Sequence, residues 1–194
     1  MTGRRVSAVV LAGGRSSRFG RDKLQEPLGG RSLLDHAIAA VRPVATEVLV
    51  ITAPLGAPAV DEDVRVVHDA SPFGGPLLGL AAGLAAAREA IVLVTAGDMP
   101  ELEPGVIELL LAALDDSGVE VAVLAEGDRP RPLPMVVRRD VARAAAERLV
   151  EAGERRLGTV TEALTRTVIA EPVWRMVDPE GRSLRDIDTA ADLP

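Results

Sequence analysis

Short runs rich in apolar residues alternate along the chain with segments of helical periodicity. These runs predict strands, which we place at Val6–Leu11, Glu47–Thr52, Val64–His68, Ala90–Thr95 and Val119–Leu124. The segments of helical periodicity between them predict helices at Leu33–Val41, Pro76–Arg88 and Pro104–Leu114. Strands that alternate with helices in this way are typical of a mostly parallel sheet that is covered on both faces.

The pattern changes after Ala125. A polar, proline-rich loop is predicted over Glu126–Pro134, and a short strand, with antiparallel pairing as one option, over Met135–Arg138. Beyond it we expect helices at Val141–Glu151 and Thr159–Leu164, an edge strand at Thr167–Val173 and a turn at Asp178–Gly181. Because no repeat or linker interrupts the chain, residues 1–194 are expected to form a single domain.

Composition narrows the class of protein. Of the 194 residues, 47% are apolar and 26% are charged, which is the usual balance of a globular protein with a full core. The net charge of -7 argues against general nucleic-acid binding. The chain has no cysteine, which excludes disulfides, thiolate metal sites and a cysteine nucleophile. No apolar run approaches the ~20 residues that span a membrane, and we expect a cytoplasmic protein without membrane partners.

The loop after the first strand is the main candidate for a binding site. Gly13 and Gly14 allow a ligand to approach the backbone, whose N–H groups can bind an anion. Positive charge follows at Arg15, Arg18, Arg21 and Lys23. The loop matches neither GxxxxGK[ST] nor GxGxxG, so a P-loop and a dinucleotide fingerprint are excluded. An ordinary glycine turn is the alternative, but this position at the end of a parallel strand favours a ligand.

Two aspartates also follow predicted strands. Asp98 comes directly after Ala90–Thr95, and Asp69 comes after Val64–His68. A carboxylate at the sheet edge suits Mg²⁺, which takes one or two carboxylates together with phosphate oxygens of the substrate. The structural alternative for both aspartates is a turn or a helix cap.

Two further segments could contribute to the same edge. Gly74-Gly75-Pro76 opens a predicted helix whose N-terminus would favour an anion, although glycines there also permit close helix–sheet packing. Asp186 and Asp188 alternate around Ile187, so in a strand they would share one face and could add a metal ligand. A solvated acidic loop is the alternative.

The order of these motifs resembles that of a known family. The segments are LAGGRSSRFGRDKLQEPLGGRSLLDHA, DASPFGGPLLGL, GDMPEL, RPLPMVVRR, EAGERRL and DIDTAADL. Together they are similar to the molybdenum cofactor guanylyltransferase family of the NTP-transferase superfamily. The resemblance implies a Rossmann-like, three-layer αβα sandwich of the nucleotide-diphospho-sugar transferase type. It also implies transfer of GMP from GTP to the phosphate of molybdopterin, with Mg²⁺ as cofactor and pyrophosphate as the second product.

The resemblance also assigns roles to residues. The guanine nucleotide would contact Leu11, Ala12, Gly13, Gly14 and Asp69, with Gly14 favouring guanine over cytosine. Arg18 and Lys23 would bind the triphosphate, and Asp98 would carry Mg²⁺, which makes Arg18, Lys23 and Asp98 the expected catalytic set. Asp188 is the candidate for a further metal ligand. Residues 1–125 would bind the nucleotide and residues 126–194 the acceptor, with Arg131, Arg138 and Arg156 near the pterin phosphate.

Some residues leave alternatives open. Ala53 stands where the family often has asparagine, while Phe19 and the acidic pair Asp186 and Asp188 also suit a molybdenum cofactor cytidylyltransferase that uses CTP. Another NTP:phosphate nucleotidyltransferase or a nucleotide-binding adaptor without turnover remains possible on these motifs. Molybdoenzyme maturation proteins are candidate partners. His36 and His68 are expected to have packing roles, and no pairing of the Ser-His-Asp type is evident.

Overall fold

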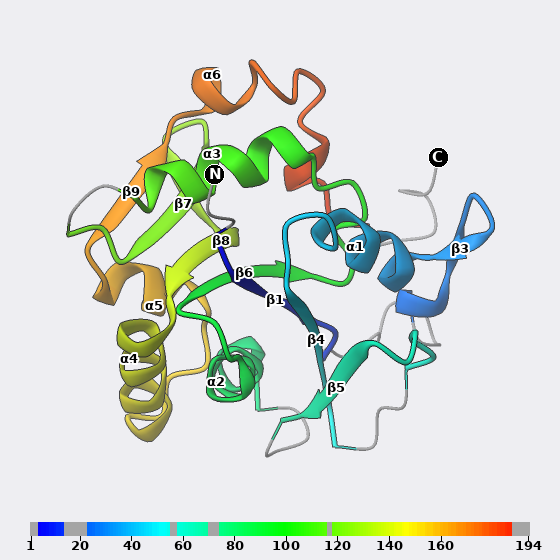
Figure 1. Cartoon of the computed structure of the whole chain (residues 1–194). Coiled ribbons are helices and arrows are strands. Elements are labelled where there is room, and N and C mark those ends of the chain that lie inside the picture. The colour runs from blue at the N-terminus through cyan, green and yellow to red at the C-terminus, as the bar shows by residue number, and fades with distance from the viewer. Residues whose placement is uncertain (1–3, 14–22, 55–57, 70–73, 116–117, 188–194) are drawn as a thin grey trace.

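A seven-stranded sheet forms the centre of the molecule (Figure 1). The computed structural model describes residues 4–13, 23–54, 58–69, 74–115 and 118–187. The strand order is β5-β4-β1-β6-β8-β7-β9. The strands are β1 (Val6–Leu11), β4 (Glu47–Thr52), β5 (Val64–His68), β6 (Ile91–Ala96), β7 (Val121–Glu126), β8 (Arg129–Arg138) and β9 (Arg166–Ile169). Only β8 runs antiparallel to its neighbours, so the sheet is mostly parallel, as predicted.

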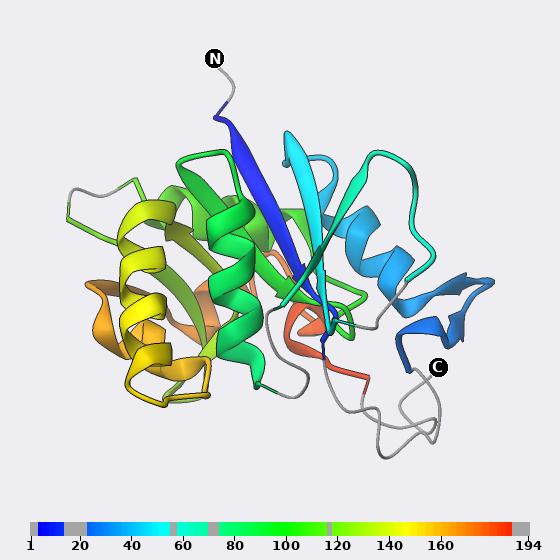
Figure 2. The ribbon, with the colours of Figure 1, turned by 90° about the horizontal axis from the view of Figure 1, so that it is seen from below.

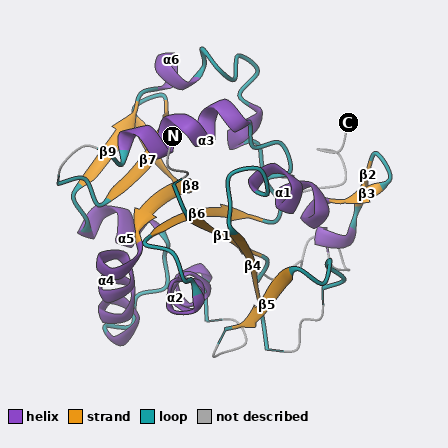
Figure 3. Ribbon diagram, viewed as in Figure 1, coloured by secondary structure: helices purple, strands orange, loops and turns teal. Residues whose placement is uncertain are grey.

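Helices cover both faces of this sheet (Figure 3). One face carries α1 (Leu33–Val41), α3 (Pro104–Ala113) and α6 (Glu171–Trp174), and the other carries α2 (Pro76–Ala86), α4 (Arg139–Glu151) and α5 (Gly158–Ala163). Side chains alternate along each strand, so Ala8 and Val10 of β1 enter one core and Val9 enters the other. The predicted three-layer α/β sandwich is therefore confirmed.

Most predicted elements are confirmed to within two residues. β1, α1, β4 and β5 have the predicted bounds, whereas α2 ends two residues before the predicted Arg88. A small hairpin of β2 (Pro27–Leu28) and β3 (Arg31–Ser32) is present that the sequence pattern did not predict. Ser32 then caps α1, because its Oγ accepts from the Asp35 N–H (3.1 Å) and the Asp35 carboxylate accepts from the Ser32 N–H (3.2 Å).

The predicted loop at Glu126–Pro134 is wrong. β8 begins at Arg129, and only a tight turn separates it from β7. β6 pairs with β8 no further than Val94 and Met135, and before Met135 only Pro130 and Arg129 are in register with β7. Pro132 and Pro134 lie where the register between β7 and β8 shifts. Proline lacks the N–H that a central strand needs, and this one-sided, irregular pairing accommodates the prolines that made the segment look like a loop.

The predicted edge strand at Thr167–Val173 is also shorter than expected. β9 is indeed the edge strand, but it ends at Ile169, and α6 follows. Trp174 is fully buried, and its indole N–H donates to the Ala125 carbonyl oxygen at 2.8 Å. The predicted turn at Asp178–Gly181 is present, closed by a bond from the Gly181 N–H to the Asp178 carbonyl oxygen (3.1 Å).

Helix α2 packs unusually close to the sheet because of its glycines. A Cβ added to Gly83 would lie 2.7 Å from Val9 Cγ1 and 3.3 Å from Ile51 Cγ1, both on fully buried β-branched side chains. Gly83 therefore has a packing role against the sheet, whereas a Cβ on Gly74 or Gly75, for which the sequence left the two options, would meet Leu78 or Arg155 and not the sheet.

We expect Gly83→Ala to destabilise the fold. The added methyl group would force α2 away from β1 and β4, and overpacking of this kind costs about 1–3 kcal/mol in the free energy of unfolding. Denaturant unfolding measures this cost. Gly158→Ala is the control, because a Cβ at Gly158 meets no atom within 4 Å. Equal stability of Gly83→Ala and the native chain would contradict the packing argument.

No helix within the described ranges is long and apolar enough to cross a membrane.

Candidate active site

The carboxyl ends of β1, β4, β5 and β6 meet at one edge of the sheet, at the lower side of Figure 2. Backbone bonds continue the sheet past the strands there. The Ala12 N–H donates to the Ile51 carbonyl (2.7 Å), the Asp69 N–H to Thr52 (2.9 Å) and the Gly97 N–H to Leu11 (2.9 Å). The residues that follow these strands are therefore held side by side, as predicted for a ligand site in a parallel sheet.

Lys23 and Asp98 form an ion pair at this edge. The distance from Lys23 Nζ to Asp98 Oδ2 is 2.7 Å, and the two side chains are 17% and 23% exposed. Both groups are thus partly withdrawn from solvent, yet within reach of a ligand. The structure brings together two of the three predicted catalytic residues, which come from segments far apart in the sequence.

Gly97 explains how Lys23 reaches Asp98. Lys23 opens the short helix η1 (Lys23–Gln25), whose buried Leu24 packs against residue 97. A Cβ on Gly97 would lie 3.2 Å from both methyl carbons of Leu24 and 3.3 Å from Leu34 Cδ1. These distances are shorter than ordinary van der Waals contacts, so the neighbouring side chains would have to shift. Glycine therefore lets η1 approach the backbone next to Asp98.

Asp69 and Gly13 lie close together at the same edge of the sheet, after β5 and β1. Asp69 is buried, and a Cβ built on Gly13 would lie 3.7 Å from Asp69 Oδ2 and 3.7 Å from the Ala53 nitrogen. These are ordinary van der Waals distances, so the described neighbours of Gly13 do not require a glycine. Its lack of a side chain keeps the space above the strand end open next to a carboxylate.

Leu11 and Ala12 provide backbone groups that continue the sheet at this edge. The Ala12 N–H and the Leu11 carbonyl are both occupied by the sheet bonds described above. These two backbone groups therefore form the floor of the site. The predicted site residues Gly14, Arg18 and Asp188 lie outside the described residues.

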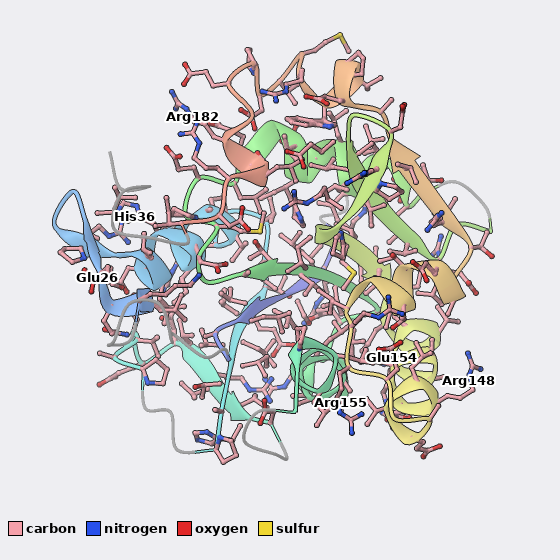
Figure 4. All side chains as sticks on the ribbon, turned by 180° about the vertical axis from the view of Figure 1, so that it is seen from behind. Glu26, His36, Arg148, Glu154, Arg155 and Arg182 are labelled. Carbon is pink, nitrogen blue, oxygen red and sulfur yellow. The ribbon has the colours of Figure 1, made fainter. Side chains whose placement is uncertain are left out.

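The start of α2 lies at the same edge. Gly75 caps the helix with a φ of 87°, and Pro76 is its first residue, as predicted. The Leu77 N–H donates to the Arg155 carbonyl at 3.3 Å, so the turn between α4 and α5 occupies one donor of this helix end. Figure 4 shows Glu154 and Arg155 beside each other on this turn, next to α2.

The three arginines that the sequence assigns to the acceptor are divided between the two edges of the sheet. Arg131 stands on β8 beyond the end of β6 and pairs with Glu126 at 2.6 Å. Arg156 pairs with Glu154 at 3.2 Å, near the start of α2. Arg138 lies opposite Ile91, where β6 begins, and donates to the carbonyls of Val119 and Leu114. Its prediction as an acceptor ligand is therefore wrong, because β8 runs antiparallel and carries it to the far edge.

The remaining polar candidates have structural roles. The His36 Nε2 donates to the Leu28 carbonyl at 2.7 Å and holds the β2–β3 hairpin, while the His68 Nδ1 lies 3.3 Å from the Ala53 carbonyl oxygen. Asp186 is exposed, and residues 185–187 run outside any helix or strand, so the strand pattern proposed for Asp186 and Asp188 is not formed up to residue 187.

The Asp98 carboxylate is a suitable ligand for Mg²⁺ at this edge of the sheet. In the described ranges, no group of three or more His, Cys, Asp or Glu side chains could hold a metal ion without help from a ligand. Mg²⁺ commonly binds through one or two carboxylates and takes its other ligands from substrate phosphates and water. Asp98, partly exposed beside a lysine, matches that donor set.

A family model decides the class of protein. The model of the MobA-like NTP transferase domain matches residues 8–167, a range that includes the Lys23–Asp98 pair and most of the central sheet. The chain belongs to the MobA-like NTP transferase family. Every strand of the central sheet except the first residues of β1 and the end of β9 lies within the match.

Two relatives of this NTP transferase are named as probable molybdenum cofactor guanylyltransferases. A probable molybdenum cofactor guanylyltransferase of Chloroflexus aggregans is 37% identical over 97% of this chain and 91% of its own length. One of Mycobacterium tuberculosis is 35% identical over 97% of this chain and 91% of that protein. The similarity therefore covers nearly the whole of this chain and nearly the whole of each relative.

Solved structures share the fold of this NTP transferase. Molybdopterin-guanine dinucleotide biosynthesis protein A from Archaeoglobus fulgidus has a TM-score of 0.79 at 24% identity, over 96% of this chain and 94% of the other. A 2-C-methyl-D-erythritol 4-phosphate cytidylyltransferase from Thermus thermophilus has a TM-score of 0.71, also at 24% identity, over 97% and 95% of the two chains. At this identity, the likeness to both structures shows a common fold.

Proposed function

We propose that this protein transfers GMP from GTP to the phosphate of molybdopterin and releases pyrophosphate. The observation that carries the proposal is the Lys23–Asp98 pair at the carboxyl edge of the sheet, in a chain whose relatives are named molybdenum cofactor guanylyltransferases. A cation and a carboxylate side by side, partly shielded from water, are what a bound nucleoside triphosphate and its metal ion need.

The chemistry requires little from the protein beyond position and charge. A phosphate oxygen of the acceptor forms a bond to the α-phosphorus of GTP, and the bond from that phosphorus to the oxygen bridging to the β-phosphate breaks. The electron pair of this bond leaves with pyrophosphate. Because the attacking oxygen is already anionic, no general base is needed, which agrees with the structural roles of His36 and His68.

Lys23 and Asp98 divide the electrostatic work. The Lys23 ammonium neutralises charge on the phosphate oxygens, and Arg18 is proposed to assist it from the loop after Gly13. Asp98 would hold Mg²⁺, which when bound screens the negative charge of the triphosphate and of the departing pyrophosphate. Asp188 remains the candidate for a second carboxylate at that metal.

The nucleotide is proposed to lie over the ends of β1, β4 and β5. Leu11 and Ala12 form the floor, Gly13 leaves room for the nucleoside, and Asp69 offers an acceptor for N–H or O–H groups of the ligand. We assign the choice of guanine to Gly14, as the family resemblance implies.

The acceptor is proposed to bind over residues 126–194, while residues 1–125 bind the nucleotide. Arg131 and Arg156 stand at the carboxyl edge of the sheet and can balance the charge of the pterin phosphate. The product would then be passed to molybdoenzyme maturation proteins. Because cells hold GTP in the cytoplasm, the proposed reaction would take place there.

A nucleotide-by-acceptor screen tests the proposed function. The purified protein is incubated with Mg²⁺, molybdopterin and GTP, CTP, ATP or UTP, and pyrophosphate and the mass of the pterin product are measured. We expect GTP to be preferred over CTP by at least about tenfold in kcat/KM. Preference for CTP would replace the proposal with a cytidylyltransferase, and GTP binding without pyrophosphate release would replace it with a nucleotide-binding adaptor.

A further inference from the structure

The last described residues of the chain lie along the loop that carries Asp98. We name residues 178–187 the C-terminal strap and residues 98–103 the Asp98 loop. The Ile187 N–H donates to the Asp98 carbonyl oxygen at 2.9 Å, and the Glu103 N–H donates to Ser183 Oγ at 3.0 Å. Between them, Arg185 Nη1 lies 3.2 Å from Glu101 Oε2. The two segments therefore run side by side in opposite directions.

Apolar burial joins the same two segments. Leu184 and Ile187 of the strap are buried, as are Met99 and Leu102 of the Asp98 loop. Leu184, Met99 and Leu102 belong to one core cluster, on the sheet face that is covered by α1 and α3. Figure 2 shows the strap, in red, near the end of the sheet at which β1 finishes. The strap is therefore part of the packed fold next to the site.

Asp178 holds the strap in its bent form. Its side chain is almost fully enclosed, with the residue 2% exposed. Oδ1 accepts the Arg182 N–H at 3.0 Å and Oδ2 accepts the Ser183 N–H at 2.8 Å. Between Asp178 and Arg182 the chain turns back through Gly181, which has a left-handed φ of 67°. One carboxylate thus fixes the turn from which Ser183 reaches the Asp98 loop.

The charge on this carboxylate is maintained by its donors. Burial by itself would raise the pKa of Asp178, but the N–H groups of Ser183 and Arg182 and the Ser183 side chain outweigh burial and lower it below the usual value. The surface charges of the strap are compensated locally, since Arg182 pairs with Glu180 at 2.8 Å and extends away from the strap in Figure 4.

The C-terminal strap makes a hydrogen bond to each end of the Asp98 loop. Glu103 is the N-cap residue of α3, and its side chain makes no capping bond to the helix. The bond from its N–H to Ser183 Oγ supplies an acceptor at this helix start. At the other end of the loop, the Ile187 N–H fixes the carbonyl of Asp98 itself.

We infer that Asp178 is a positioning residue for Asp98. Through Ser183 and Ile187 it keeps the Asp98 loop in the conformation in which the Asp98 carboxylate faces Lys23. The inference rests on the proposed function in so far as Asp98 holds the metal. Its physical content, that Asp178 determines the order of the Asp98 loop, is independent of the reaction.

Hydrogen exchange of the ligand-free protein tests the inference without any turnover. In Asp178→Ala we expect the Glu103 and Ile187 N–H groups to exchange at least about tenfold faster than in the native chain, because each would lose about 1.4 kcal/mol or more of protection. N–H groups in the middle of β1 should exchange at an unchanged rate under conditions of local opening.

Glu47→Ala is the matched control. The Glu47 carboxylate is 11% exposed and accepts the Ser7 hydroxyl (2.7 Å), the Arg88 N–H (2.7 Å) and Arg65 Nη1 (2.6 Å). It lies where β4 begins, at the opposite edge of the sheet from Asp98. Its loss should lower the melting temperature, as the loss of Asp178 does, but leave exchange in the Asp98 loop unchanged.

Kinetics connect the strap to the site. We expect Asp178→Ala to raise the Mg²⁺ concentration for half-maximal turnover and to lower kcat by about 10-fold or more, with little change in the KM for GTP. Asp178→Asn keeps one acceptor oxygen and should restore part of the loss. Ser183→Ala removes the acceptor for the Glu103 N–H and the hydroxyl that bonds to Asp178, but it keeps the Asp178 carboxylate. It replaces Asp178→Ala in these measurements should that variant fail to fold.

The outcomes separate the two proposals. Unchanged exchange at Glu103 and Ile187 in the strap variants, or equal acceleration there in Glu47→Ala, would overturn the positioning role. Faster exchange together with native kcat and Mg²⁺ dependence would also overturn it. Absence of pyrophosphate release by the native protein would instead refute the proposed function, and the exchange rates would still decide whether Asp178 orders the Asp98 loop.

Discussion

Asp98→Asn is expected to lower turnover of GTP by about 100- to 1,000-fold while the protein remains folded. The substitution keeps the size of the side chain but removes the charge that pairs with Lys23 at 2.7 Å and would hold Mg²⁺. An amide oxygen is a weaker ligand for a hard cation than a carboxylate. Pyrophosphate release at saturating GTP and molybdopterin, together with the melting temperature, measures both effects.

The control for Asp98→Asn is Asp140→Asn. Asp140 is an exposed aspartate on α4 that pairs with Arg139, and its replacement should leave turnover unchanged. Asp98→Asn should also respond to metal, because higher Mg²⁺ partly compensates for a weaker ligand. An Asp98→Asn enzyme with at least half of the native kcat at all Mg²⁺ concentrations would remove Asp98 from the proposed mechanism.

Lys23→Gln is expected to lower kcat by about 100-fold or more, since it removes the positive charge next to the triphosphate. It also leaves the Asp98 carboxylate without its ammonium partner. The two groups act on the same ligand, so their losses should not add. In the double variant Lys23→Gln/Asp98→Asn we expect a kcat close to that of the less active single variant.

Steady-state kinetics of the four proteins measure this coupling. Arg143→Gln serves as the charge control, because Arg143 pairs with Glu147 on the outer face of α4 and lies outside the proposed site. If the effects of Lys23→Gln and Asp98→Asn multiplied in the double variant, the two residues would act independently. The ion pair at 2.7 Å would then have no role as a unit in catalysis.

The elements that the sequence predicted well are those with a clear local signal. β1, α1, β4 and β5 are bounded by glycine, proline or polar residues and have uniform apolar periodicity, and all four have the predicted bounds. The first part of β8 was missed because its prolines are typical of loops, whereas the predicted strand at Met135–Arg138 is confirmed as the end of β8. The antiparallel direction, which the sequence left as one option, carries Arg138 to the far edge and makes its predicted acceptor role wrong.

The sequence predicted that the site lies at the carboxyl edge of the sheet, but it did not predict the contact between Lys23 and Asp98. Asp69 and Asp98 follow apolar strands, and the carboxyl ends of parallel strands meet, so their common location follows from the pattern. The approach of Lys23 to Asp98 could not be read in the same way, because it depends on Leu24 packing against Gly97. The roles of Gly14, Arg18 and Asp188 stay predictions.

The layered α/β fold, the edge at which chemistry can occur and the residues at the strand ends follow from the amino-acid sequence alone, because they depend on local periodicity and on the direction of consecutive strands. The contact of Lys23 with Asp98, the start of β8 at Arg129 and the strap that Asp178 holds against the Asp98 loop are evident only in the folded chain. Each of these involves segments that are distant in sequence and meet through packing and backbone hydrogen bonds, for which no local pattern of residues provides a signal.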